Sequence, residues 1–118
     1  MTKVYAGRRT RMGCLVTVDG RELPTYSRLR CYCPNGFEWD GDENGESQLA
    51  LAILADYWGQ WHLEHFALPL VDDFRELVID WLPHDRWVLT EDQVTAAIRA
   101  ILHERGAQSQ IALLGAHN

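Results

Sequence analysis

The chain has 118 residues, a formal net charge of −6 and 47% hydrophobic residues. This length fits one domain, and the composition is that of a globular protein rather than a disordered one. No apolar run approaches the roughly 20 residues that a membrane span needs, and the first residues show no apolar signal core. We therefore expect one cytoplasmic domain over residues 1–118, with residues 107–118 as a tail that is flexible or docks.

Charge is distributed unevenly along the chain. Residues 1–30 carry seven basic and two acidic side chains, a net of +5, whereas the remainder carries a net of −11. The two regions could pack together and neutralise each other, or they could form a basic and an acidic side of the surface. A basic side would steer a nucleic acid or an acidic protein, and an acidic side would dock on a basic partner. The whole chain is too acidic for a general nucleic-acid binder.

The first third of the chain has the pattern of β-strands. Short strand patterns occur at residues 4–7 and 14–18, and the dipeptide Asp19-Gly20 after the second is typical of a hairpin turn. Residues 21–23 could begin the return strand. Residues 29–33 alternate with a period of two, which predicts a further, half-exposed strand.

Helical patterns follow the predicted strands. Residues 48–58 are apolar on nearly every face, which predicts a buried central helix with Ser47 as its N-cap. A second amphipathic helix is predicted between Pro69 and Pro83, with Trp81 on its apolar stripe.

A third helix is predicted after a short extended link at residues 87–89. It starts with the capping-box pattern Thr90-Glu91-Asp92-Gln93 and should end at Gly106. In the tail, residues 111–114 could add an edge strand or dock on the core or on a partner. Strands followed by helices predict an α+β fold, with a small antiparallel sheet of about three N-terminal strands packed by about three C-terminal helices.

The acidic loop from Asp40 to Glu46 is the first candidate for chemistry. The spacing of Asp40, Asp42 and Asn44 matches the start of an EF-hand calcium loop. The twelfth position, where a bidentate glutamate should stand, is Leu51, and the preceding segment lacks a helical pattern. A solvated turn whose charges favour the following helix is the simpler interpretation.

Cysteine and histidine pairs are the second candidate. Cys31 and Cys33 would share a face of the predicted strand, and His62 and His65 would share a face of a helix, so the four could supply a tetrahedral zinc site. Their C-x-C and H-x-x-H spacings do not match zinc fingers. The common nucleotide-binding and hydrolase motifs are missing from the sequence. We therefore expect no cofactor, no metal and no enzymatic activity.

Several segments resemble a small family of bacterial and phage-borne proteins that is classed as a domain of unknown function. In that family an F-E-W-G-Y-G-G-S-G-like stretch precedes Q-L-A-L-A-I-L, and the matching segments here are residues 37–39 and 48–54. V-T-V-D-G at 16–20, Leu82-Pro83, Trp87 and residues 94–102 also fit, so the resemblance covers about residues 3–102. The loop at 40–47 departs from the family because it is acidic rather than glycine-rich. The resemblance implies a shared fold and an origin in prokaryotes or their mobile elements, and no activity.

Together these features favour a non-enzymatic protein-binding module. Because small acidic proteins of phages often inhibit host defence, the resemblance implies a stoichiometric, anti-CRISPR-like inhibitor that acts through an acidic surface. The predicted contact residues belong to the acidic loop and its neighbouring tryptophans: Asp40, Asp42, Glu43, Glu46, Trp39 and Trp61. One alternative is a calcium- or ligand-binding module that uses Asp40, Asp42 and Asn44. The other is a nucleic-acid binder that uses the N-terminal arginines Arg8, Arg9, Arg11, Arg28 and Arg30.

Overall fold

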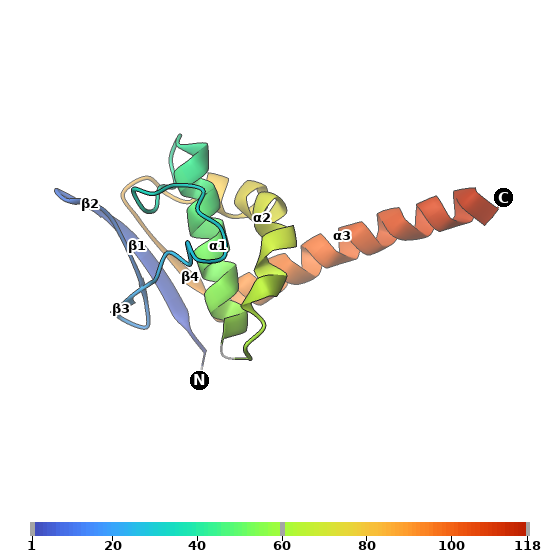
Figure 1. The fold of residues 1–118 in the computed structure, drawn as a ribbon, viewed down its shortest axis with the longest axis horizontal. Helices are drawn as coiled ribbons and strands as arrows, with labels where there is room; N and C mark the ends of the chain where they lie inside the picture. Colours follow the sequence, from blue (N-terminus) through green and yellow to red (C-terminus); the bar gives the residue numbers. More distant parts are fainter. Residues whose placement is uncertain (1, 60, 118) are drawn as a thin grey trace.

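The computed structural model describes residues 2–59 and 61–117, with side chains up to residue 106. Four strands form one antiparallel sheet in the order β3-β2-β1-β4: β1 (Val4–Thr10), β2 (Gly13–Val18), β3 (Arg21–Glu22) and β4 (Arg86–Thr90). The helices lie on one side of this sheet (Figure 1): α1 (Glu43–Gly59), α2 (Val71–Leu77), α3 (Glu91–His117) and the 3-10 helices η1 (Glu64–Leu70) and η2 (Ile79–Trp81). The predicted α+β fold is confirmed.

The sheet differs from the prediction at two places. Residues 87–89, predicted as a link, belong to the edge strand β4 (Arg86–Thr90), which pairs with β1 so that Trp87 lies opposite Gly7. The predicted strand at residues 29–33 is wrong, because this segment is a loop that bonds to a side chain instead of a strand. The buried Gln48 of α1 accepts hydrogen bonds from the Tyr32 and Cys33 amides at 2.7 and 3.1 Å.

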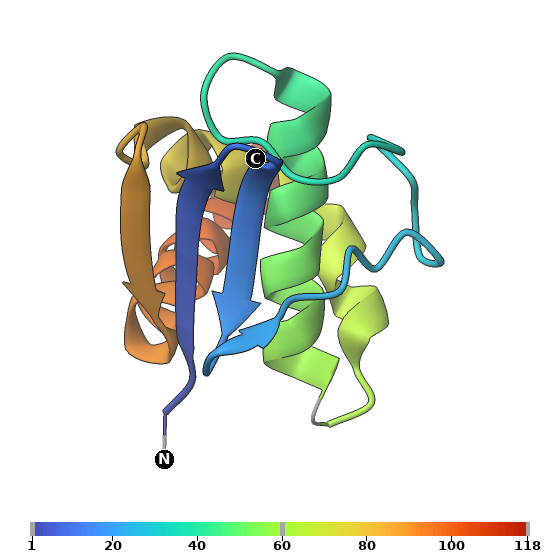
Figure 2. The same cartoon turned by 90° about the vertical axis from the view of Figure 1, so that its left-hand side faces the viewer.

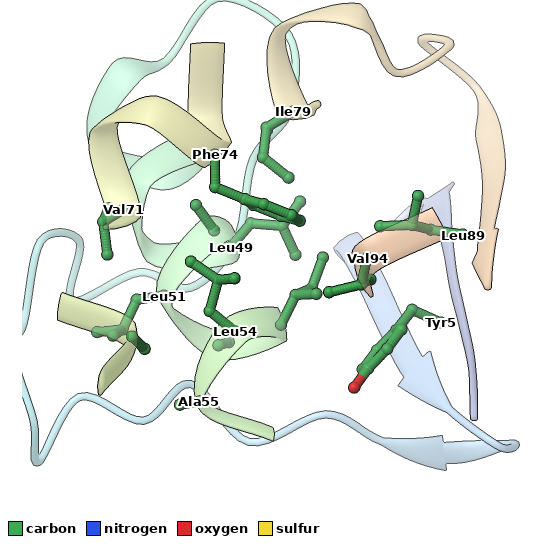
Figure 3. Close-up of a cluster of buried hydrophobic side chains, with 14 of the residues drawn as sticks. Tyr5, Leu49, Leu51, Leu54, Ala55, Val71, Phe74, Ile79, Leu89 and Val94 are labelled. Carbon is green, nitrogen blue, oxygen red and sulfur yellow. The ribbon is translucent and has the colours of Figure 1, made fainter. Parts of the chain in front are cut away.

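Helix α1 is the centre of the hydrophobic core. All residues from 49 to 55 have 0% exposure, and they pack between the sheet and α2 with Phe74, Ile79, Leu89 and Val94 (Figure 3). The predicted buried helix is therefore confirmed, although it begins four residues before Ser47. It begins earlier because Asp42 Oδ1 accepts hydrogen bonds from the Asn44 and Gly45 amides, at 3.1 and 3.3 Å.

The second predicted helix is divided into three short pieces. The chain forms η1 through Pro69, then α2, then η2, and Val78 between the last two has a φ of −119°. A 3-10 turn has fewer residues per turn than an α-helix, so the apolar stripe shifts at η2. Ile79 is consequently buried at 0% exposure, whereas Trp81, predicted to be in the core, is 79% exposed.

Helix α3 starts as the sequence predicts and ends later. Thr90 Oγ1 accepts a hydrogen bond from the Gln93 amide at 3.2 Å, and Gln93 Oε1 accepts one from the Thr90 amide at 2.8 Å, which is a complete capping box. The predicted end at Gly106 is wrong, because α3 continues to His117 and projects from the body (Figure 1). Residues 111–114 are thus helical rather than an edge strand, and the contacts of side chains 107–118 lie outside the described part. No helix in the described residues is long and apolar enough to cross a membrane.

Candidate functional site

The acidic side chains of the 40–46 loop do not form one patch in the fold, because they contact different parts of the chain. Asp42 caps α1, and Asp40 pairs through Oδ2 with Nδ1 of His84, which precedes β4. Glu43 has a side chain that is 76% exposed and lies 3.6 Å from the guanidinium of Arg75. Asp40, Asp42 and Glu43 therefore reach the surface, but each has a partner within the chain.

Glu46, predicted as a partner-contact residue, is buried in the structure. It lies inside the molecule at 7% exposure, where burial and the neighbouring Asp80 raise the pKa of its carboxyl to about 7. Arg75 lies beside the pair, with Nη1 at 3.8 Å from Asp80 Oδ2. A partner cannot reach Glu46 without opening the contact between α1 and η2.

Trp39, also predicted as a partner-contact residue, is part of the core. It is 1% exposed, its Nε1 donates to the carbonyl of His84 at 2.8 Å, and its ring meets the edge of Trp87 with centroids 5.5 Å apart. The guanidinium of Arg9 covers the ring at 5.1 Å. Trp39 therefore joins the 37–42 segment to the sheet and is closed to a partner.

A polar network around Glu38 joins the F-E-W segment to β1 and β2. Glu38 Oε1 accepts hydrogen bonds from Arg9 Nη2 at 2.7 Å and from the Trp39 amide at 3.0 Å. Burial opposes ionisation, but these two donors hold the pKa of Glu38 below its usual value. Burial and Glu38 raise the pKa of the Cys14 thiol, which disfavours its thiolate form.

Neither metal site suggested by the sequence is assembled in the described part of the chain. Among residues 2–59 and 61–106, no three His, Cys, Asp or Glu side chains are placed to hold an ion. Asp40 and Asp42 are engaged with His84 and the start of α1, and Cys31 and Cys33 are free thiols.

The N-terminal arginines do not form one basic patch. Arg8 lies on β1, Arg11 follows that strand, and Arg9 is paired with Glu38. Arg28 forms an ion pair with Glu64 at 2.9 Å, and Arg30 covers the ring of Tyr32 at 5.0 Å. Arg28 lies near Gly59 at the end of α1, whereas Glu38, the partner of Arg9, packs against Gly45 near its start. The two glycines are about 21 Å apart along the helix.

The end of α1 and the segment after it carry a group of large apolar side chains, which we call the aromatic patch: the half-buried Trp58 and the exposed Trp61, Leu63 and Phe66. Trp61 is 65% exposed, Phe66 48% and Leu63 37%, and the rings of Trp58 and Phe66 lie 6.2 Å apart. Sequence reasoning identified Trp61. It missed Leu63 and Phe66 because polar residues interrupt the pattern there, and no signal showed which side of η1 would face outward.

Backbone hydrogen bonds hold the aromatic patch in place. The carbonyl of Trp58 accepts from the amides of Trp61 and Leu63, at 2.9 and 3.1 Å. His62 has a φ of +58°, a conformation that few non-glycine residues adopt. Such a backbone persists when its surroundings determine it, and here the hydrogen bonds to the Trp58 carbonyl fix the backbone of Trp61 and Leu63 on either side of His62.

A small polar hollow of about 180 Å³ lies beside this turn. Its lining includes Lys3, Tyr26, Asp56 and Glu64. Asp56 Oδ2 accepts hydrogen bonds from Lys3 Nζ at 3.0 Å and from the Tyr5 hydroxyl at 2.9 Å, and burial with Asp56 raises the pKa of Tyr5. The aromatic patch is thus bordered by charged and hydroxyl groups.

Residues 5–100 match the family of unknown function DUF6166, and the chain belongs to this family. No curated protein and no solved structure matches the chain. The match confirms the resemblance to an uncharacterised domain, while the motif and the bacterial or phage origin stay predictions. It spans the sheet, α1, the aromatic patch and the first part of α3.

Proposed function

We propose that this member of DUF6166 is a protein-binding module whose partner contacts the aromatic patch. The observation that carries the proposal is the exposure of Trp61, Phe66 and Leu63 at one turn. Covering them would remove roughly 300 Å² of apolar surface from water, or about 7 kcal/mol before the entropic cost of association is subtracted.

The surroundings of the patch favour a protein partner. Tryptophan is enriched among the residues that dominate interface energies, and such residues are usually surrounded by a polar rim. Here the rim consists of the Arg28–Glu64 ion pair and the Lys3–Asp56 pair. The backbone amides of Trp61 and Leu63 are already bonded to the carbonyl of Trp58, which lowers the backbone entropy that binding must remove at these two residues.

The narrower prediction, a stoichiometric inhibitor of a host defence complex, is supported by the resemblance alone. In that version a basic partner would meet the exposed carboxylates Asp40, Asp42 and Glu43 in addition to the aromatic patch. The two surfaces lie at opposite ends of α1, so substitutions can separate their contributions.

The proposal is tested by affinity capture from a nuclease-treated prokaryotic lysate with the tagged chain. A stoichiometric protein should be retained by the wild type and lost by Trp61→Ala/Phe66→Ala. The matched control is Trp81→Ala, which removes a 79% exposed indole near the start of α1 and should retain the partner. Loss in Asp40→Asn/Asp42→Asn/Glu43→Gln but not in the aromatic variant would move the contact to the acidic loop. The absence of any protein partner would reject the proposal.

A further inference from the structure

The sheet has an open side that faces away from the helices, which we call the outer sheet face. Figure 2 shows β4, β1 and β2 from this side, with no helix in front of them. Tyr5, Val16 and Leu89 point into the core, so the alternate residues of each strand point outward. These outward residues are Val4, Ala6, Arg8, Thr10, Gly13, Leu15, Thr17, Arg86, Val88 and Thr90, with Glu22 of β3 opposite Thr17.

Small residues in the central strand make this face hollow. Ala6 and Gly7 of β1 lie at the floor of a depression of about 490 Å³ that extends to Arg86 and Val88 of β4. Position 7 requires glycine, because a Cβ there would collide with the indole of Trp87. A second depression of about 110 Å³ shares Ala6 and Gly7 and extends to β2, so the two together cross β1.

Two arginines stand side by side at one end of this hollow. Arg8 and Arg86 are direct partners in the register between β1 and β4, and like charges at such positions repel. Neither makes an ion pair within the described residues. Arg9, the next residue along β1, shows the contrast: it points inward and is paired with Glu38 at 2.7 Å.

The floor beside the two arginines is apolar. Val88 is 63% exposed and Val4 is 39% exposed on the same face. The chain therefore presents two unpaired guanidinium groups next to a shallow apolar trough. An anion at Arg8 and Arg86 would relieve their repulsion, and an apolar side chain next to it would cover Ala6 and Val88.

We infer that the outer sheet face binds an acidic segment of a protein, whose carboxylates pair with Arg8 and Arg86 and whose apolar side chain lies over Ala6 and Val88. Guanidinium and carboxylate groups match in a two-bond geometry. A single-stranded nucleic acid fits less well, because none of the outward residues of these strands is aromatic and the net charge of −6 repels a polyanion. This inference uses residues that the aromatic patch does not contain.

Selection from a displayed library of random 12-residue peptides on the immobilised full chain tests the inference. The enriched peptides should carry two or more acidic side chains and an apolar one. Labelled copies of them should bind Arg8→Gln/Arg86→Gln about tenfold more weakly, or worse, by fluorescence anisotropy. This variant removes a repulsive pair on the surface, so it should fold as well as the wild type.

Two further variants complete the design. Arg21→Gln/Arg99→Gln removes two exposed arginines elsewhere and should keep the peptide affinity, as should Trp61→Ala/Phe66→Ala, so this inference and the proposed function can fail separately. Enrichment without acidic residues, or equal affinity of Arg8→Gln/Arg86→Gln, would overturn the inference. Tighter binding of a 12-nucleotide single-stranded DNA through the same two arginines would also overturn it.

Discussion

We predict that the buried side chain of Gln48 stabilises the 25–33 loop through its hydrogen bonds. This side chain has 0% exposure, and all its hydrogen bonds go to backbone groups of the loop. Its Oε1 accepts from the Tyr32 and Cys33 amides, and its Nε2 donates to the Thr25 and Arg30 carbonyls at 2.7 and 3.2 Å. The side-chain amide of Gln48 thus makes the hydrogen bonds to the loop backbone that a neighbouring β-strand would otherwise make.

Gln48→Met keeps the length of the side chain and removes these four hydrogen bonds. Each buried backbone group left without a partner costs about 1–3 kcal/mol. Tyr32, Cys33 and Thr25 are only partly covered, so water can satisfy some of them after a small movement of the loop. We therefore expect the free energy of unfolding to fall by about 2–4 kcal/mol, a large share of the roughly 5–15 kcal/mol of a typical domain.

Urea denaturation and amide hydrogen exchange measure the effect. The amides of Tyr32 and Cys33 should lose protection in Gln48→Met, while the core of α1 keeps it. The matched control is Leu49→Met, a volume-conserving change at a neighbouring position that is also fully buried, which should cost less than about 1.5 kcal/mol. If the two variants were equally stable and equally protected in the loop, the role assigned to Gln48 would be wrong.

Two further predictions concern the sheet and the start of α1. Gly7→Ala places a Cβ 2.5 Å from Cζ2 and Nε1 of Trp87 and should lower the free energy of unfolding by about 1–3 kcal/mol in a urea titration, whereas Gly106→Ala, with nothing within 4 Å, should not. Glu46 has a pKa of about 7 in the folded chain against 4.5 ordinarily, so the folded state holds the proton longer. Its contribution to stability should therefore fall between pH 4.5 and 7, by up to about 1.4 kcal/mol per pH unit, and level off above. Glu46→Gln should flatten this dependence in unfolding measured from pH 4 to 8, and identical pH profiles would contradict the burial of Glu46 beside Asp80.

The fold was predictable where the signal is local. The apolar run of residues 49–55 identified α1, and the Thr90 and Gln93 pair identified the start of α3. The alternation of apolar and polar residues at 29–33 led to a wrong strand prediction, because such a pattern does not show whether a second strand is available for pairing. In the fold, the Gln48 side chain makes the hydrogen bonds to this segment. The prediction that Trp81 lies in the core was wrong because it assumed 3.6 residues per turn throughout, whereas residues 79–81 form a 3-10 helix.

The candidate site was less predictable because its chemistry depends on distant partners. Asp40 and His84 are 44 residues apart in the sequence, and Glu46 contacts Asp80, which belongs to a later helix, so these partners could not be seen in the acidic loop itself. Trp39 looked available for the same reason, although residues from β1 and β4 cover it. Trp61, predicted as a partner contact, is 65% exposed and so is accessible, and the contact itself stays a prediction.

The most direct test of the account is the affinity of the captured partner for three forms of the chain, measured by titration calorimetry. Wild type and Trp81→Ala should bind with the same Kd, and Trp61→Ala/Phe66→Ala should bind at least about 100-fold more weakly, as loss of two central aromatic contacts requires. Binding to the wild type should also show a negative heat-capacity change, because apolar surface is buried. Equal Kd values for all three forms would contradict the claim that the aromatic patch is the binding surface.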